Sequence, residues 1–263
     1  MIHFICPAYF LKKNANEKII ITKIKSTIRT GDDIGIYLQP WKSLTDRARV
    51  KFRDSKSFWG NKIEDIACET DCGSEIPLNT YEKDEVGKIL ETSIKTLKDL
   101  GFGEPKSFSV GGWQSSKSIY EVAYNNNLKY SFSAASPQTL KKGLQYYPIF
   151  GCINQIWHNI TPSNQPFIFQ SGIASIIEFG NSGMKADYLT AEDLVELFRE
   201  YLRLHKEKPD SPLYFHIGIH QETAYQFTER LISAFERIHF ISQKESVFLK
   251  QFSLPDRNFC YGN

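Results

Sequence analysis

Two histidines near the end of the chain have the spacing of residues on one face of a strand. They are His216 and His220, within the segment 215–223. Side chains four residues apart on a strand share a face but lie about 13 Å apart, so the two imidazoles cannot bind one metal ion together. His220 ends the strand expected over 213–220, whereas His216 is expected to be a hydrogen-bonded core histidine.

Two further segments combine glycines and aromatic side chains with an expected strand. The segment 31–41 ends in Tyr37, Gln39 and Trp41, and the segment 105–113 ends in a Gly-Gly-Trp turn at Trp113. Glycines after a strand indicate a shaped turn. Aromatic faces suit the apolar sides of sugar rings, so these side chains are candidates for sugar binding. Ordinary packing is the alternative for Trp113.

In their order and separations, the segments 31–41, 105–113 and 215–223 resemble the polysaccharide deacetylases, the metal-dependent N- and O-deacetylases of carbohydrate esterase family 4. The resemblance covers most of residues 2–238. It implies a distorted six- or seven-stranded parallel (β/α) barrel with its site at the carboxyl ends of the strands. It also implies zinc as cofactor, an N-acetylated glycan as substrate and His220 as the catalytic acid. Tyr37, Trp41 and Trp113 would be the substrate-binding residues.

The chain departs from this family at the residues that perform its chemistry. Where the family presents metal-binding histidines, this sequence has Tyr37, Gln39 and Trp41. A neutral phenol, an amide and an indole make a poor zinc site. The arginine expected before the Gly-Gly-Trp turn is Ser109, and the aspartate often seen after the next strand is Ser131. No residue is therefore assigned to a metal.

The paired aspartates of the family belong to a strand that would precede the segment matching residues 2–11. We therefore expect the barrel to be weak or open beside the strand predicted over 2–10. Such an edge needs cover, which the insert 42–81, the tail 241–263 or a second copy of the chain could supply. Asp32 and Asp33 precede their strand, so they are expected at the opposite end of the barrel.

Two functions remain open from the sequence. The first is a hydrolase that removes N-acetyl or O-acetyl groups from a carbohydrate. The second is a catalytically inactive deacetylase-like barrel that acts as a carbohydrate-binding or regulatory protein. Its cleft would be lined by some of Tyr37, Trp41, Trp59 and Trp113.

Composition limits the partners and the compartment. A formal charge of +2 on 263 residues gives no reason to expect nucleic acid or an anionic membrane as partner. No apolar run has the length of a membrane span, and the N-terminus lacks a basic leader, so a cytoplasmic protein is expected. Cys68 and Cys72 could form a structural zinc site or a local disulfide, but reduced thiols are favoured for such a chain.

Apolar periodicity and turn residues predict one domain over 1–240, followed by the tail. Alternating strands and helices indicate βαβ units around a parallel sheet, and an open doubly wound sheet is the alternative to a barrel. Strands are predicted at 2–10, 34–38, 106–110, 129–133, 145–150, 175–179 and 213–220, and helices at 17–30, 82–100, 116–125, 190–206 and 223–238.

Overall fold

The structure is a computed structural model that describes residues 1–12, 16–53, 57–60, 71–73, 75–180, 187–220, 224–251 and 254. Its strands are β1 (Ile2–Ile5), β2 (Asp33–Leu38), β3 (Ser107–Val110), β4 (Tyr130–Ser131), β5 (Phe167–Ser171) and β6 (Ala174–Glu178). Its helices are α1 (Ala8–Leu11), α2 (Glu17–Thr27), α3 (Lys42–Arg47), α4 (Lys83–Asp99), α5 (Lys117–Asn125), α6 (Pro137–Leu144), α7 (Pro148–Ile156), α8 (Ala191–Glu207) and α9 (Ala224–Lys244), with 3-10 turns η2 (Leu78–Thr80) and η3 (Gly111–Trp113).

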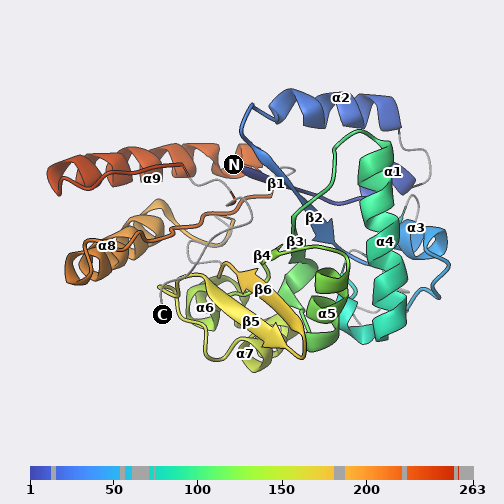
Figure 1. The fold of residues 1–263 in the computed structure, drawn as a ribbon. Coiled ribbons are helices and arrows are strands. Elements are labelled where there is room, and N and C mark those ends of the chain that lie inside the picture. The colour runs from blue at the N-terminus through green and yellow to red at the C-terminus, as the bar shows by residue number, and fades with distance from the viewer. Residues whose placement is uncertain are drawn as a thin grey trace.

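The six strands form one sheet in the order β1-β2-β3-β4-β6-β5 (Figure 1). Neighbouring strands from β1 to β6 are parallel, and β5 pairs antiparallel with β6. The sheet does not close, because β1 lies at one edge and β5 at the other. The predicted α/β fold with a mostly parallel six-stranded sheet is confirmed. The sheet is open beside β1, the strand beside which an opening was expected.

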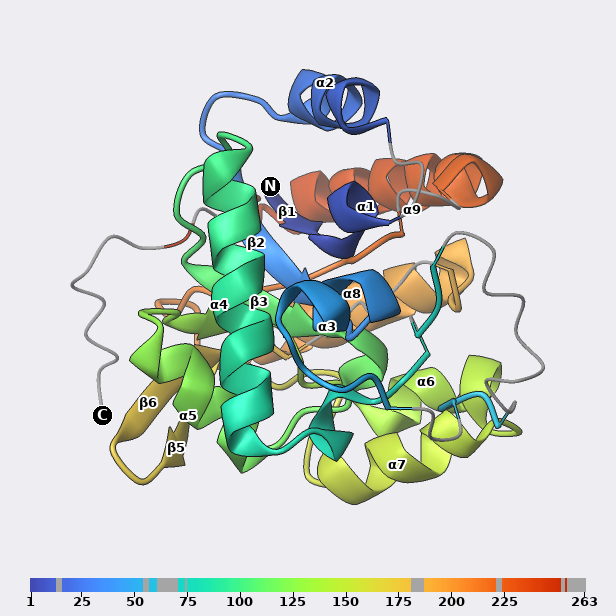
Figure 2. The same cartoon turned by 90° about the vertical axis from the view of Figure 1, so that its right-hand side faces the viewer.

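Helices α4 and α5 cover one face of the sheet, and Figure 2 shows α4 in front of the strands. A capping box of Glu82 and Glu85 begins α4. On α5, the ring of Tyr120 lies 5.8 Å from that of Phe108 on β3. The predicted helices at 82–100 and 116–125 are confirmed, because their apolar stripes meet this face. The fully buried part of the α4 stripe is Val86, Ile89, Leu90 and Leu97.

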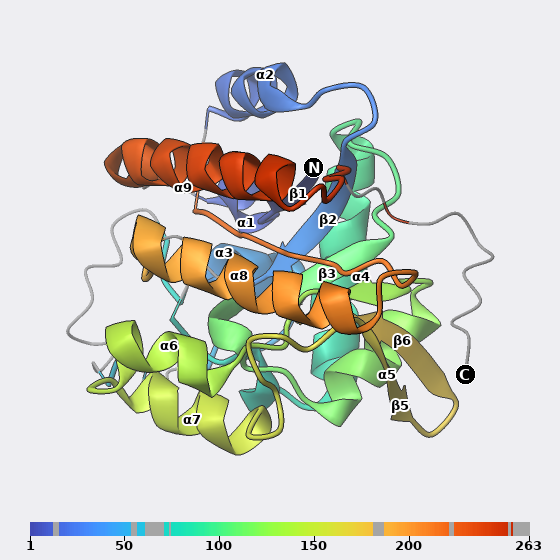
Figure 3. The same ribbon diagram turned by 90° about the vertical axis from the view of Figure 1, so that its left-hand side faces the viewer.

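The opposite face of the sheet is covered by the chain that connects α8 to α9 (Figure 3). On this face the ring of Phe132, just after β4, stacks on Phe179, just after β6, at 4.9 Å. Tyr214 and Leu254 pack against the same cluster. A closed barrel would enclose this face. The segment 213–220, which was expected to be the last strand of the barrel, lies over it.

The edge strand β1 is partly covered by the end of the chain. Leu254 packs near Ile2 and Phe4, and its backbone N–H donates to Asp33 Oδ2 at 3.1 Å. The C-terminal tail was one of the three sources of cover predicted for this edge. The boundary expected at residue 240 falls inside α9, which continues to Lys244.

Three predicted strands are wrong in whole or in part. The strand expected over 2–10 ends at Ile5, because α1 follows it. The one over 145–150 is the junction of α6 and α7, where Pro148 takes the first helical position. The segment 213–220 forms no strand and contains only an isolated bridge at Gly218. Short apolar runs do not distinguish a strand from a buried helical turn or an extended loop.

The β5–β6 hairpin was not fully predicted, since only its second strand was found. Ser171 pairs with Ala174, so two residues make the turn. Gly172 adopts φ +56°, the left-handed conformation that such a turn requires. The sequence Gly172-Ile173 lacks the usual Asn-Gly or Asp-Gly signal, and the hairpin therefore went unrecognised.

The cysteines correct one expectation. Cys72 is disulfide-bonded, whereas reduced thiols were favoured. Cys68, the other half of the motif, lies outside the described residues, as does Cys260. None of the helices in the described ranges is long and apolar enough to cross a bilayer.

Gly35 on β2 sits where the sheet has no room for a side chain. A Cβ placed there would lie 2.5 Å from Cε1 of Phe4 and 2.7 Å from Oγ of Ser107. We expect Gly35→Ala to lower the free energy of unfolding by roughly 1–3 kcal/mol, because the core cannot absorb the methyl group without displacing its neighbours. Chemical denaturation measures this.

The matched control is Gly87→Ala, inside α4, where a Cβ meets nothing within 4 Å. That change should raise stability by about 0.5–1 kcal/mol, since alanine favours a helix over glycine. Equal effects of the two variants would contradict the close approach at Gly35.

Candidate functional site

His220 contacts a carboxylate that the sequence analysis did not identify. Its Nδ1 pairs with Oδ2 of Asp187, which lies shortly before α8. The Asp187 side chain is 9% exposed and that of His220 is 28% exposed, so the carboxylate is buried while the imidazole reaches solvent. Asp187 Oδ1 is also buried and has no hydrogen-bond partner among the described residues.

The contact fixes how His220 can move a proton. A carboxylate beside Nδ1 favours the tautomer with the proton on that nitrogen. The lone pair of the neutral imidazole is then on Nε2, which can take a proton from water and return it to a leaving group. A histidine oriented by a buried aspartate is the arrangement used for acyl transfer in several unrelated enzymes.

Three contacts hold the segment that carries Asp187. Arg230 of α9 donates from Nη1 to the Leu189 carbonyl oxygen at 3.0 Å. Tyr188 packs over α6 at Gly143, where an added Cβ would lie 3.1 Å from the Tyr188 Cβ. The hydroxyl of Thr190 accepts from the Asp193 backbone N–H and caps α8 as predicted. The position of the carboxylate therefore depends on α6, α8 and α9 together.

Trp113 lies beneath this segment rather than at an open surface. It is 4% exposed, and its ring centroid is 6.4 Å from that of Tyr188. The turn before it is tight, with φ of +61° at Gly112 and +57° at Trp113. Trp157 Nε1 donates to the Trp113 carbonyl oxygen at 2.9 Å. The ring of Trp113 thus supports Tyr188 and has little surface for a ligand.

Of the other predicted substrate-binding residues, Tyr37 lies in the carboxyl half of β2 and Trp41 follows that strand. Both are half-buried. Trp41 Nε1 donates to Gln39 Oε1 at 3.0 Å, and the Trp41 ring meets the edge of Tyr9 at 5.8 Å.

The residues at the family's metal positions do not fit zinc. The amide oxygen of Gln39 is engaged by Trp41, and an indole offers no lone pair to a metal. In the part of the chain that the structure describes, no three His, Cys, Asp or Glu side chains gather in a way that could hold an ion.

Two serines, at positions where the resemblance led us to expect an arginine and an aspartate, make internal hydrogen bonds. Ser109 Oγ donates to the Phe132 carbonyl oxygen at 3.0 Å. Ser131 Oγ donates to Ser133 Oγ at 3.0 Å. Each hydroxyl joins β3 or β4 to the chain after β4, so these positions have a structural use here.

His216 packs against the aromatic cluster on the face of the sheet opposite α4, and the hydrogen bond expected of it stays a prediction. Its ring meets that of Phe132 edge-on at 5.2 Å and 82°. Burial lowers the pKa of His216 to about 4, so the imidazole is neutral near pH 7. Asp32 lies at the opposite end of the sheet, as predicted, where it accepts from the Met1 amino group at 2.8 Å and contacts His3 Nε2 at 2.9 Å.

A second buried carboxyl group, Glu178, was missed by the sequence analysis. It ends β6 and is fully buried against α5. Its Oε1 accepts from the backbone N–H groups of Ser133 at 2.8 Å and Ala134 at 2.7 Å, and its Oε2 accepts from Tyr120 Oη at 2.5 Å. Burial raises the pKa of Glu178 to about 7 despite these donors. Its place between sheet and helix makes it a structural group.

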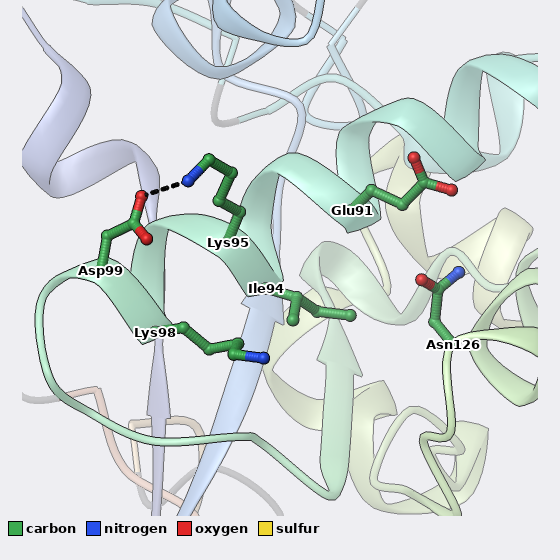
Figure 4. Close-up of a pocket in the computed structure, with 6 residues that line it drawn as sticks. All are labelled: Glu91, Ile94, Lys95, Lys98, Asp99 and Asn126. Atoms are coloured by element: carbon green, nitrogen blue, oxygen red, sulfur yellow. Dashed lines mark hydrogen bonds and ion pairs between the residues drawn. The ribbon is translucent and has the colours of Figure 1, made fainter.

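A shallow depression on the outer side of α4 is unrelated to His220 (Figure 4). It is lined by Glu91, Ile94, Lys95, Lys98, Asp99 and Asn126, and Lys95 pairs with Asp99 at 2.7 Å. Its charges are largely paired along the helix surface, which is typical of a solvated face.

Comparisons with known proteins add a fold likeness at most. No protein-family profile matches the chain. No curated protein matches it either. Among solved structures, one from Mycobacterium smegmatis, provisionally described as a polysaccharide deacetylase, superposes with a TM-score of 0.45 and 10% identity. The match covers 97% of this chain and 76% of that chain. A likeness this distant carries no argument about activity.

Proposed function

We propose that the protein is a hydrolase that removes acetyl groups from a carbohydrate, with His220 as the proton-transfer group and Asp187 as its orienting carboxylate. The observation that carries the proposal is the contact between His220 Nδ1 and Asp187 Oδ2. The choice of an acetylated sugar as substrate rests on the resemblance of the segments 31–41, 105–113 and 215–223 to the polysaccharide deacetylases.

The proposed reaction uses only residues of this chain and water. Nε2 of His220 accepts a proton from a water molecule as its oxygen bonds to the acetyl carbonyl carbon. The carboxylate of Asp187 stabilises the resulting imidazolium. The bond from the acetyl carbon to the sugar oxygen or nitrogen then breaks, and the proton on Nε2 passes to that atom. The products are acetate and the free hydroxyl or amine.

The second candidate is a carbohydrate-binding or regulatory protein without catalysis. Its support is the hydrogen bond from Trp41 to Gln39 at the family's metal positions, together with the internal bonds of Ser109 and Ser131. Side chains that hydrogen-bond to one another are not available to a metal or a substrate. Such contacts are expected in a protein that keeps the fold without the catalysis.

Acetate release by the full chain distinguishes the two candidates. The substrates are oligomers of N-acetylglucosamine and O-acetylated xylan, and each preparation is also analysed for bound metals. We expect acetate release that persists after dialysis against a chelator, because the His220–Asp187 pair requires no metal. Release strictly dependent on stoichiometric zinc would contradict this mechanism. Sugar binding with no acetate from either substrate would favour the second candidate.

A further inference from the structure

Three aromatic side chains lie beside the segment that carries Asp187. Tyr188 follows Asp187 directly in the chain. Its side chain packs against Gly143 on α6, four residues before Tyr147. The ring of Tyr147 in turn meets that of Trp59 at 5.2 Å. We refer to Trp59, Tyr147 and Tyr188 as the aromatic platform.

The three rings come from separate parts of the chain that pack tightly together. The segment 57–60 lies against the start of α7, where a Cβ on Gly60 would be 3.1 Å from Cγ of Pro148. Tyr147 is the residue just before α7. Tyr188 is held over α6 by its close approach to Gly143. These contacts fix the platform relative to Asp187.

The platform is open to solvent although its members are large aromatic residues. Tyr147 is 48% exposed, and Trp59 and Tyr188 are half-buried. The Trp59 and Tyr147 rings are nearly perpendicular, at 85°. A flat ring placed on the face of one would therefore meet the edge of the other. This geometry accommodates a pyranose ring, whose C–H side is apolar and whose rim carries hydroxyl groups.

The charge at the inner end of the platform selects the kind of sugar. The Asp187 carboxylate, which pairs with His220, places a negative charge at this end. It would repel an anionic sugar. The chemistry therefore fits a neutral sugar, which includes N-acetylated hexosamines, better than a uronic acid.

We propose that the aromatic platform binds a neutral pyranose ring next to the one whose acetyl group meets His220. This assignment rests on the proposed function, because that function places the substrate at His220. It adds a binding subsite that involves none of the three segments that resemble the deacetylases, since Trp59, Tyr147 and Tyr188 lie outside them.

The test is calorimetric titration of the full chain with the tetramer of N-acetylglucosamine. We expect Tyr147→Ala and Trp59→Ala each to weaken binding by roughly 3- to 10-fold, the usual range for an aromatic contact. Tyr147→Phe should retain most of the affinity, because stacking needs the ring and not the hydroxyl. Tetragalacturonic acid should bind far more weakly than the neutral tetramer.

The matched control is Tyr124→Ala on α5, where the side chain is 40% exposed, and it should bind as the wild type does. His220→Ala should keep the affinity while losing hydrolysis, which separates the two proposals. Wild-type protein that binds but releases no acetate would overturn the hydrolase and leave the platform. Acetate release with unchanged Kd and KM in Tyr147→Ala and Trp59→Ala would overturn the platform, as would a wild type that does not bind the tetramer.

Discussion

Replacing His220 with alanine is expected to lower kcat for acetate release by roughly 10²–10⁴-fold, or about 3–5 kcal/mol in the transition state. The reason is that Nε2 of the imidazole, oriented by Asp187 at Nδ1, carries the proton both from water and to the leaving group. KM should change little, since proton transfer matters in the transition state and not in substrate binding. Steady-state kinetics with an acetylated oligosaccharide measures both constants.

Asp187→Asn tests the orienting role without removing the side chain. The amide keeps the shape of the carboxylate but cannot stabilise an imidazolium, so kcat should again fall by orders of magnitude. The control is His239→Ala, an exposed histidine on α9 whose ring contacts Gln243. That variant should be as active as the wild type. Unchanged kcat in His220→Ala, with a native melting temperature, would remove the basis of the proposed function.

Glu178→Gln is expected to make the protein more stable than the wild type above pH 8 by about 3 kcal/mol, and to match it near pH 4. Burial raises the pKa of Glu178 from 4.5 to about 7 in the folded protein. The folded state therefore holds this proton more tightly than the unfolded state does. The stabilisation is complete below pH 4.5 and is lost as the pH rises through 7. One pKa unit corresponds to about 1.4 kcal/mol.

The glutamine preserves the neutral form at every pH, and its carbonyl oxygen can still accept from the Ser133 and Ala134 N–H groups. Urea denaturation of both proteins between pH 4 and 9 measures the effect. His216 acts in the opposite sense, since its lowered pKa stabilises the fold above pH 6.5 and this contribution is lost as the pH falls through 4. The contribution of His216 is the same in the wild type and in Glu178→Gln, so it cancels in the comparison. A difference that does not vary with pH would show that folding does not raise the pKa of Glu178.

Elements with strong local signals were predictable from the sequence. Helix α8 was found because Thr190 and Asp193 form a capping box ahead of an apolar stripe. Strand β3 and the turn that ends at Trp113 were found because glycines follow an apolar run. Each signal lies within a few residues of the element that it specifies, so no knowledge of distant contacts was needed.

Elements whose conformation depends on distant partners were not predictable. The apolar segment around Tyr147 was expected as a strand, but Pro148 and the packing of α6 against α7 make it a helical junction. The segment 213–220 alternates like a strand, yet it crosses the face of the sheet with only an isolated bridge. Periodicity shows which side chains are apolar, whereas the neighbours available for hydrogen bonding decide whether an apolar run becomes a strand.

The sequence by itself determined the α/β class and the largely parallel order of its strands. Tertiary structure alone decided that Asp187, 33 residues before His220, pairs with this histidine and that Trp113 is buried beneath Tyr188. It also placed Glu178 between β6 and α5. The physical reason is that propensity and periodicity act over a few residues along the chain. The pairing of charges, the burial of a ring and the pKa of a carboxyl group depend on which distant segments meet.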